Sequence, residues 1–294
     1  AAGKELCTFT PWQLGPQDSL LEYGYDYGKC HRAGVDWVSL EIMEEVTSRR
    51  FYVKEGWESV GITSAACAKA LAPGLKILWT TSTCNCPEHW HTLRDNPNII
   101  ERECLALGGA RALQAKGHLE PIIDGTLTIF GIDLLDTEWR WLKRRWDEGF
   151  GYRVKRNLGP AIVWSDDILY EHLHRGRKWP LSAGVSKLRY AGIPIQSAIH
   201  VDNIDDYPGQ SLLLINPIGI TDVQAQKVFN AAKAGSPVTV MGEVEHPLLL
   251  KMLGIKRVPT EDVQLGGYEA DGAQVRKEGE HGNVLAAING KTVY

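Results

Sequence analysis

Short apolar runs alternate with stretches of helical spacing along most of the chain, and this alternation predicts its secondary structure. Four runs in the first half have strand character, because each is short, largely apolar and bounded by Gly, Pro or polar residues: residues 7–11, 34–42, 75–79 and 111–115. Helices are predicted between them at residues 27–33, 63–71 and 98–109. In the last helix, Asn98 is the expected N-cap and Glu101 the expected capping-box partner. This order implies parallel strands joined by right-handed crossovers.

The alternation continues after Gly159-Pro160, which we take as a boundary. The second half is predicted to contain four more strands, at residues 161–165, 194–201, 211–217 and 237–242. Thr221-Asp222 should cap a helix that runs to Ala234, and a further helix is expected at 247–253. Strands and helices at this spacing predict an open, doubly wound parallel sheet. From about residue 256 the composition shifts to Gly, Glu and short apolar pieces, with a hairpin signal near the end.

Polar or aromatic residues follow each predicted strand of the first half. Trp12 follows the first strand, Glu41 ends the second, and the polar segment 80–85 follows the third. In a (β/α)₈ barrel these strand ends gather on one face and build the active site. Glu41 is therefore a candidate acid, base or hydroxyl anchor, and a salt-bridged rim residue is the alternative. Trp79 and Trp90 could floor a sugar subsite, or they could pack in the core and in loops.

Composition narrows the partners that the chain is expected to have. A net charge of -4 argues against a general nucleic-acid surface, and no apolar run is long enough for a transmembrane helix. Ten Trp against five Phe suits sugar stacking as well as core packing. The stretch 137–150 is predicted to be an amphipathic helix that docks Trp139, Leu142 and Trp146 on the first domain. The first residues carry no signal pattern and no initiating Met, which suggests a mature or truncated chain.

The sequence gives little reason to expect a metal or a cofactor. Cys84 and Cys86 with His89 and His91 could ligate a metal, but C-x-C is not a usual structural-zinc spacing. The second half has no G-x-G-x-x-G motif and no P-loop. An amidotransferase-type enzyme would need a Cys at the elbow after residue 215, and the sequence there is Asn216-Pro-Ile-Gly. The second half is therefore expected to be structural.

This order of parts resembles the family-42 β-galactosidases. "AGVDWVSLEI" is similar to the sixth barrel strand of that family, "GLKILWTTSTCNCPEHW" to the seventh, and "ECLALGGARALQAKG" to the helix and the eighth strand. "GPAIVWSDD" and "LLLINPIGITDVQAQKVFNAAKAGSPVTVMG" resemble its trimerisation domain. The resemblance implies the C-terminal part of a (β/α)₈ barrel at residues 1–157. A glutamine-amidotransferase-like trimerisation domain would follow at 158–256, and a small β region at 257–294.

The resemblance further implies a glycoside hydrolase that acts on a carbohydrate and assembles as a homo-oligomer, a trimer in that family. Glu41 is the catalytic candidate, and the substrate-binding candidates are Trp12, Trp79, Thr80, Glu88 and Trp90. The sequence departs from the pattern of this family at two points that concern catalysis. The family's first four barrel strands have no counterpart in these residues, and Thr80 stands near the position of its nucleophilic Glu. A catalytically inactive carbohydrate-binding or scaffolding homologue is the alternative.

Overall fold

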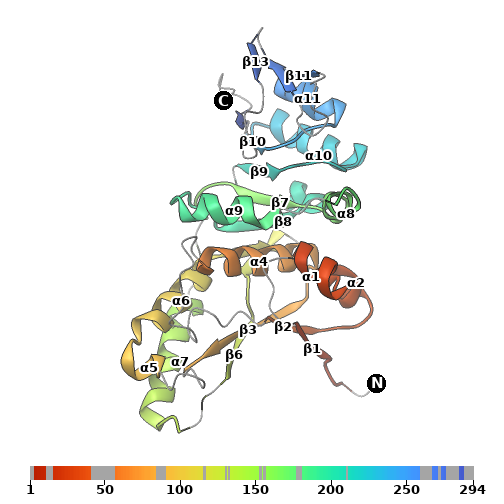
Figure 1. Cartoon of the computed structure of the whole chain (residues 1–294). Helices are drawn as coiled ribbons and strands as arrows, with labels where there is room; N and C mark the ends of the chain where they lie inside the picture. Colours follow the sequence, from red (N-terminus) through yellow and green to blue (C-terminus); the bar gives the residue numbers. More distant parts are fainter. Residues whose placement is uncertain are drawn as a thin grey trace.

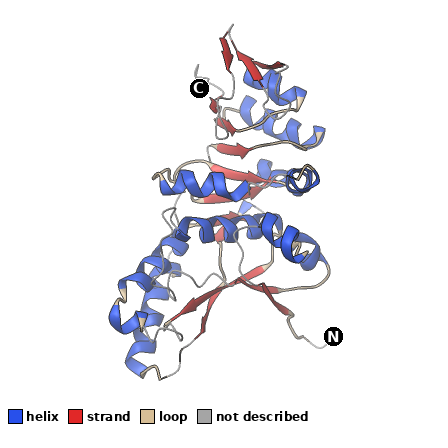
Figure 2. Cartoon of the chain, viewed as in Figure 1, coloured by secondary structure: helices blue, strands red, loops and turns tan. Residues whose placement is uncertain are grey.

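Two sheets dominated by parallel strands, with helices packed against them, make up most of the computed structural model (Figures 1 and 2). The chain is thus an α/β protein, as the alternation of strands and helices predicts. The structure describes residues 3–10, 16–40, 57–83, 91–114, 117–129, 131, 133–151, 154, 157–176, 181–209, 211–258, 267–270, 273–275 and 285–287. None of the helices in these ranges combines the length and apolar character that a membrane crossing requires.

The first sheet has four parallel strands, which lie side by side in the order in which they occur along the chain. They are β1 (Cys7–Thr10), β2 (Trp37–Leu40), β3 (Lys76–Ser82) and β6 (Gly125–Ile129). The helices in this part are α1 (Pro16–Tyr23), α2 (Tyr27–Arg32), α4 (Trp57–Leu71), α5 (Thr92–Asp95), α6 (Asn98–Gly109) and α7 (Asp136–Phe150).

The second sheet has seven strands in the order β14-β10-β9-β7-β8-β4-β5. Their bounds are β4 (Arg111–Leu113), β5 (Leu119–Pro121), β7 (Ala161–Trp164), β8 (Ser197–His200), β9 (Leu212–Ile215), β10 (Val238–Met241) and β14 (Leu285–Ala287). Only the two edge strands, β5 and β14, are antiparallel to their neighbours. Numbered from β7 along the chain, the order is 2-1-3-4, so the winding reverses between β7 and β9.

The remaining elements complete the second half. They are α8 (Asp166–His174), α9 (Leu181–Tyr190), the 3₁₀ helix η2 (Val201–Asp206), α10 (Asp222–Lys233) and α11 (Pro247–Leu253), and a small antiparallel sheet of β11 (Ile255–Val258), β12 (Gly267–Ala270) and β13 (Ala273–Val275). The start of α10 confirms the sequence prediction: Thr221 accepts from the Gln224 N–H, and Gln224 reaches back to the Thr221 N–H.

Helix α4 lies between the two sheets and contacts β3 on one side and β8 and β4 on the other (Figure 1). Every residue from 61 to 70 is buried, and most of these side chains are small, which lets backbone approach from both sides. Lys69 is the exception in size and charge. Its side chain is 2% exposed and its Nζ lies 2.5 Å from Asp124 Oδ2. The same carboxylate accepts the Ile77 N–H at 2.7 Å, so one ion pair connects α4 to β3 and to the start of β6.

One strand lies in a different sheet from the one predicted. Residues 111–115 were expected to follow 75–79 as the next strand of the first sheet, but β4 pairs with β8 and β5 in the second sheet. The neighbour of β3 is β6 instead, and β3 itself extends through Ser82 to pair with it. Alternation of strands and helices fixes parallel direction, but the neighbour of a strand is chosen by tertiary contacts.

Two helix predictions also need correction. Pro97, not Asn98, is the N-cap of α6, no side chain caps this helix, and Glu101 bonds instead to Arg145 of α7. Helix α7 packs on α6 of the first domain through Leu142 and Trp146, as predicted, but Trp139, the third residue of the predicted face, is 41% exposed. This close packing requires glycine, because a Cβ on Gly108 would lie 1.9 Å from the carbonyl oxygen of Gly149.

Replacing Lys69 by Met should lower the free energy of unfolding by about 3 kcal/mol, because the substitution leaves the Asp124 carboxylate without its buried cation. Urea unfolding monitored by circular dichroism would measure this. Lys251→Met, which removes an exposed lysine on α11, serves as the matched control and should change stability by less than about 0.5 kcal/mol. Equal stabilities of the Lys69 variant and the control would contradict the structural role given to the pair.

Candidate functional site

Hydroxyl side chains lie at the carboxyl ends of three adjacent strands of the first sheet. Thr10 of β1 donates from Oγ1 to the Ser39 carbonyl at 3.1 Å, and the hydroxyls of Ser39 and Thr80 lie 3.1 Å apart. All three residues are buried. By register, Thr10 lies on the same face of the sheet as Leu40 and Trp79, whereas Ser39 and Thr80 lie on the other face. The carboxyl edge of this sheet is therefore polar, as expected where parallel strands build a site.

Trp79 and Thr81 point to the opposite face of β3, toward helix α6. Trp79 Nε1 donates to Glu103 Oε1 at 2.6 Å, and Thr81 Oγ1 donates to Glu103 Oε2 at 3.0 Å. Trp79 is only 3% exposed. A sugar ring has no access to its face in this arrangement, so Trp79 packs in the core between β3 and α6 and does not form a sugar subsite.

Glu103 is a buried carboxylate that sequence reasoning missed. Its position carried a usable signal: Ile100, Cys104 and Leu107 mark the apolar face of α6, and Glu103 lies on that face. A buried carboxylate needs hydrogen-bond donors, and β3 supplies two of them. Glu103 thus fixes the orientation of the strand that carries Thr80.

Of the six candidate site residues, the structure describes Trp79 and Thr80. Thr80 is buried and contacts Ser39 from the neighbouring strand. Glu41, Trp12, Glu88 and Trp90 lie outside the described residues. In the sequence, Glu41 directly follows Leu40, the last residue of β2.

A charged cluster occupies the rim beyond β3 and β6. Arg94 makes a two-point pair with the Glu138 carboxylate at 2.6 and 2.9 Å, and it also donates to the carbonyl of Asp133 at 2.9 Å. The hydrogen bonds from Arg94, assisted by the Leu135 N–H, lower the pKa of Glu138 to about 2. Glu138 is therefore ionised across the physiological range, which suits an anchoring group and not a proton donor.

Backbone strain and a histidine accompany this cluster. Asp133 has φ 62°, a left-handed conformation that among the described non-glycine residues is shared only with Asn216. Such outliers tend to persist at functional sites. His91 accepts the Arg94 N–H through Nδ1 at 3.2 Å, which caps α5 beside the rim. The cluster thus offers a fixed guanidinium, a carboxylate and an imidazole next to the strand ends.

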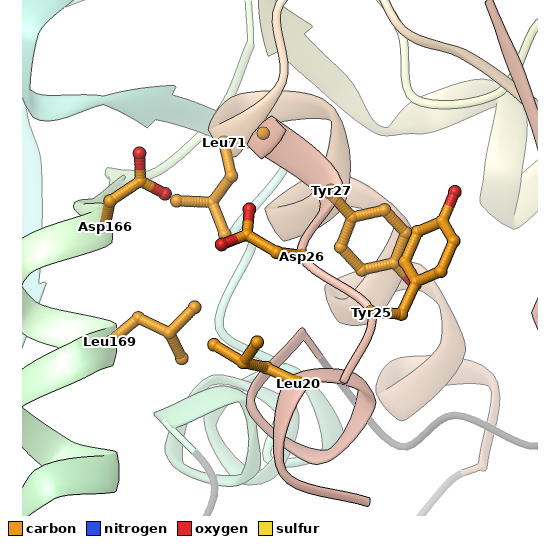
Figure 3. Close-up of a pocket in the computed structure, with 8 residues that line it drawn as sticks. Leu20, Tyr25, Asp26, Tyr27, Leu71, Asp166 and Leu169 are labelled. Carbon is orange, nitrogen blue, oxygen red and sulfur yellow. The ribbon is translucent and has the colours of Figure 1, made fainter. Parts of the chain in front are cut away.

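A second group of carboxylates surrounds a small cavity where α2 meets α8 (Figure 3). Asp26 accepts a hydrogen bond from the Tyr170 hydroxyl and another from the Lys29 N–H at 2.8 Å. Asp166, from the start of α8, lines the same cavity. The cavity measures about 10 Å³, which is room for about one water molecule and not for a sugar ring.

These two carboxyl groups have opposite pKa shifts. Burial acts to raise the pKa of Asp26, but hydrogen bonds from Tyr170 and Lys29 outweigh it and the net shift is downward. Burial raises the pKa of Asp166, while nearby His200 acts in the opposite direction. Opposite shifts are typical of acid–base pairs. Because the cavity excludes a substrate, we assign this pair a part in joining the two halves and not in chemistry.

No three His, Cys, Asp or Glu side chains gather as a metal site within the described ranges. No family model, curated protein or solved structure matches this chain. The function therefore has to be argued from the strand ends and the groups around them.

Asp166→Asn should raise the melting temperature at pH 7. The raised pKa means that the folded state holds the Asp166 proton more tightly, so this group favours folding fully below its ordinary pKa of 3.8 and loses that effect as pH rises. Asparagine does not ionise, so the variant does not lose this stability as pH rises. The difference in melting temperature between the variant and the parent should therefore become smaller from pH 7 to pH 4. Calorimetry at pH 7, 5.5 and 4 would follow it.

Asp206→Asn, at an exposed position, is the control for Asp166→Asn. Stabilisation by Asp166→Asn that is the same at pH 4 and pH 7 would contradict the burial argument.

Asp26→Asn should act in the opposite direction at pH 7 and lower the free energy of unfolding by about 1–3 kcal/mol, because it weakens the bonds to Tyr170 and Lys29.

Proposed function

We propose that this chain is a glycoside hydrolase whose active site lies at the carboxyl edge of the four-stranded sheet. In this proposal the sheet is the C-terminal part of a (β/α)₈ barrel, and the doubly wound half is a flavodoxin-like or glutamine-amidotransferase-like domain. Two features support it. The strands of the first sheet lie in chain order, as barrel strands do, and the order 2-1-3-4 in the second sheet is the flavodoxin-like one.

The observation that carries the proposal is the polar carboxyl edge of β1, β2 and β3, with Glu41 next in sequence after β2. The hydroxyls of Ser39 and Thr80 and the bond from Thr10 to the Ser39 carbonyl are buried, so they hold the three strand ends together beneath this edge and do not contact the sugar themselves. Sugar recognition needs hydroxyl, amide and charged groups in fixed positions, and the Arg94–Glu138 pair adds a charged anchor at the same edge.

Glu41 is the proposed catalytic carboxylate. Glycoside cleavage takes two carboxyl groups, of which one protonates the leaving oxygen and the other acts as nucleophile or base. Glu88 is a proposed substrate-binding residue, and Trp12 and Trp90 are the proposed stacking residues. Glu138 is a poor candidate for the acid, because its lowered pKa keeps it ionised.

The second candidate function is carbohydrate binding without cleavage, and Thr80 favours it. Thr80 stands near the position where the resembling family has its nucleophilic Glu, and its hydroxyl is buried against Ser39. A threonine there cannot form the glycosyl–enzyme intermediate. Such a protein would keep the polar edge and would have lost the chemistry.

The test is hydrolysis of a panel of aryl glycosides by the intact chain and by Glu41→Gln. The amide has the shape of the carboxylate but cannot donate or accept the proton, so the rate should fall by about 10²- to 10⁴-fold. Glu120→Gln, an exposed position on β5, is the matched control and should keep activity within about twofold of the parent.

Absence of hydrolysis on every glycoside would overturn the hydrolase proposal. Calorimetric titration with the same sugars would then decide the second candidate, because a binding protein still gives heat on titration. Equal activities of the parent and Glu41→Gln would leave a hydrolase but remove Glu41 from its mechanism.

The doubly wound half serves assembly in this proposal, and the homo-oligomer is a trimer. Asn216 follows β9 with φ 44°, the strained elbow at which amidotransferases carry their nucleophile. Its side chain accepts the Glu243 N–H at 2.8 Å, and an amide cannot attack a carbonyl. Sedimentation velocity should give about three times the monomer mass. A monomer at high concentration would contradict this assignment.

A further inference from the structure

A second hollow in the described part of the chain lies away from the carboxyl ends of the first sheet. It is an open groove of about 330 Å³ between α4, α6 and the segment that joins α9 to β8. Gly109 ends α6 just before β4, and Gln196 directly precedes β8, so the groove lies at the amino ends of these strands. Its volume is near the lower limit for ligand pockets, about 300 Å³, which selects a small ligand.

Apolar side chains form the walls of this groove and are left partly uncovered. Leu105 on α6 is 52% exposed and Ile193 before β8 is 40% exposed, while Ile62 of α4 is buried behind them. Gly109 keeps the space open, since a Cβ there would meet only the Gln196 amide nitrogen, at 3.8 Å. An apolar ligand body would gain free energy by covering these side chains.

The polar side chains that line the groove are those of Arg189 and Gln196. Arg189 is the one charged side chain among the described residues that line it. The Gln196 Oε1 accepts the Leu158 N–H at 3.1 Å, which leaves the Nε2 amide as the donor nearest to Gly109. Arg189 also interacts with other groups of the protein, but a guanidinium has five N–H donors and can serve a ligand as well.

We propose that this groove binds a small amphiphilic carboxylate, whose apolar chain covers Leu105 and Ile193 and whose carboxylate lies against Arg189 and Gln196. The charge of the lining indicates the ligand class: its one charged side chain is an arginine, an amide donor lies in the same lining, and a guanidinium can pair with a carboxylate through two parallel hydrogen bonds. The inference does not depend on the proposed hydrolase, because the groove and the carboxyl edge use different residues.

The test is calorimetric titration of the whole chain with octanoate, octanol and octylammonium. Octanoate should bind at least tenfold more tightly than octanol, and octylammonium should bind more weakly than either, because only octanoate matches the charge of Arg189. Arg189→Gln should weaken octanoate at least tenfold and bring it close to octanol. Lys251→Gln, which removes an exposed cation on α11, is the control and should leave binding unchanged.

Gly109→Leu keeps the test decisive if Arg189→Gln does not fold. A Cβ at this position meets only Gln196 Nε2, at 3.8 Å, so the variant should fold, and its side chain should occupy the groove and abolish octanoate and octanol binding together. Three results would each overturn the proposal. The first is no octanoate binding up to 10 mM, which limits the binding free energy to about 3 kcal/mol. The others are equal binding of octanoate and octanol, and unchanged binding by Gly109→Leu.

Discussion

The ion pair between buried Lys69 and partly exposed Asp124 connects the helix between the two sheets to β3 and to the start of β6. Lys69 lies on α4, the helix that both sheets contact, and its side chain is almost completely removed from solvent. A buried ammonium is tolerated only when a carboxylate and further hydrogen bonds compensate for its lost hydration. Asp124 provides the charge and at the same time accepts the Ile77 N–H. The position of α4 therefore determines how β3 and β6 meet, and with them the polar edge.

The sequence predicts elements well where local chemistry specifies them. Thr221 and Gln224 form the capping box that specifies the start of α10. The apolar runs of β7, β9 and β10 identify buried strands. Strand partners could not be predicted in the same way. Residues 111–113 have no local feature that favours β8 over β3 as a partner. All three are buried in the sheet where they lie, and burial alone does not select a neighbouring strand. Strand β6, with the sequence Gly-Thr-Leu-Thr-Ile, lacks the continuous apolar run that marked the others.

Of the six candidate site residues, the structure describes Trp79 and Thr80, and their contacts could not be predicted. Polar residues at strand ends led to the carboxyl edge, and Thr80 lies there beside Ser39. Trp79 shows the limit of composition, because its indole faces Glu103 inside the protein, and whether a strand residue faces a helix or the other side of the sheet follows from tertiary packing. The Arg94–Glu138 pair joins residues 44 positions apart, and no local signal marks such a pair.

The proposed function requires the carboxyl edge of the first sheet to receive a sugar. Hydrogen–deuterium exchange with and without a galactose-configured iminosugar tests it most directly, because it locates binding whether or not catalysis occurs. Binding at this edge should slow exchange at residues 80–83 and 91–95, with little change at the amino ends of β4 and β8. Protection confined to the edge of β7 and β9, or no change in exchange at saturating iminosugar, would contradict it.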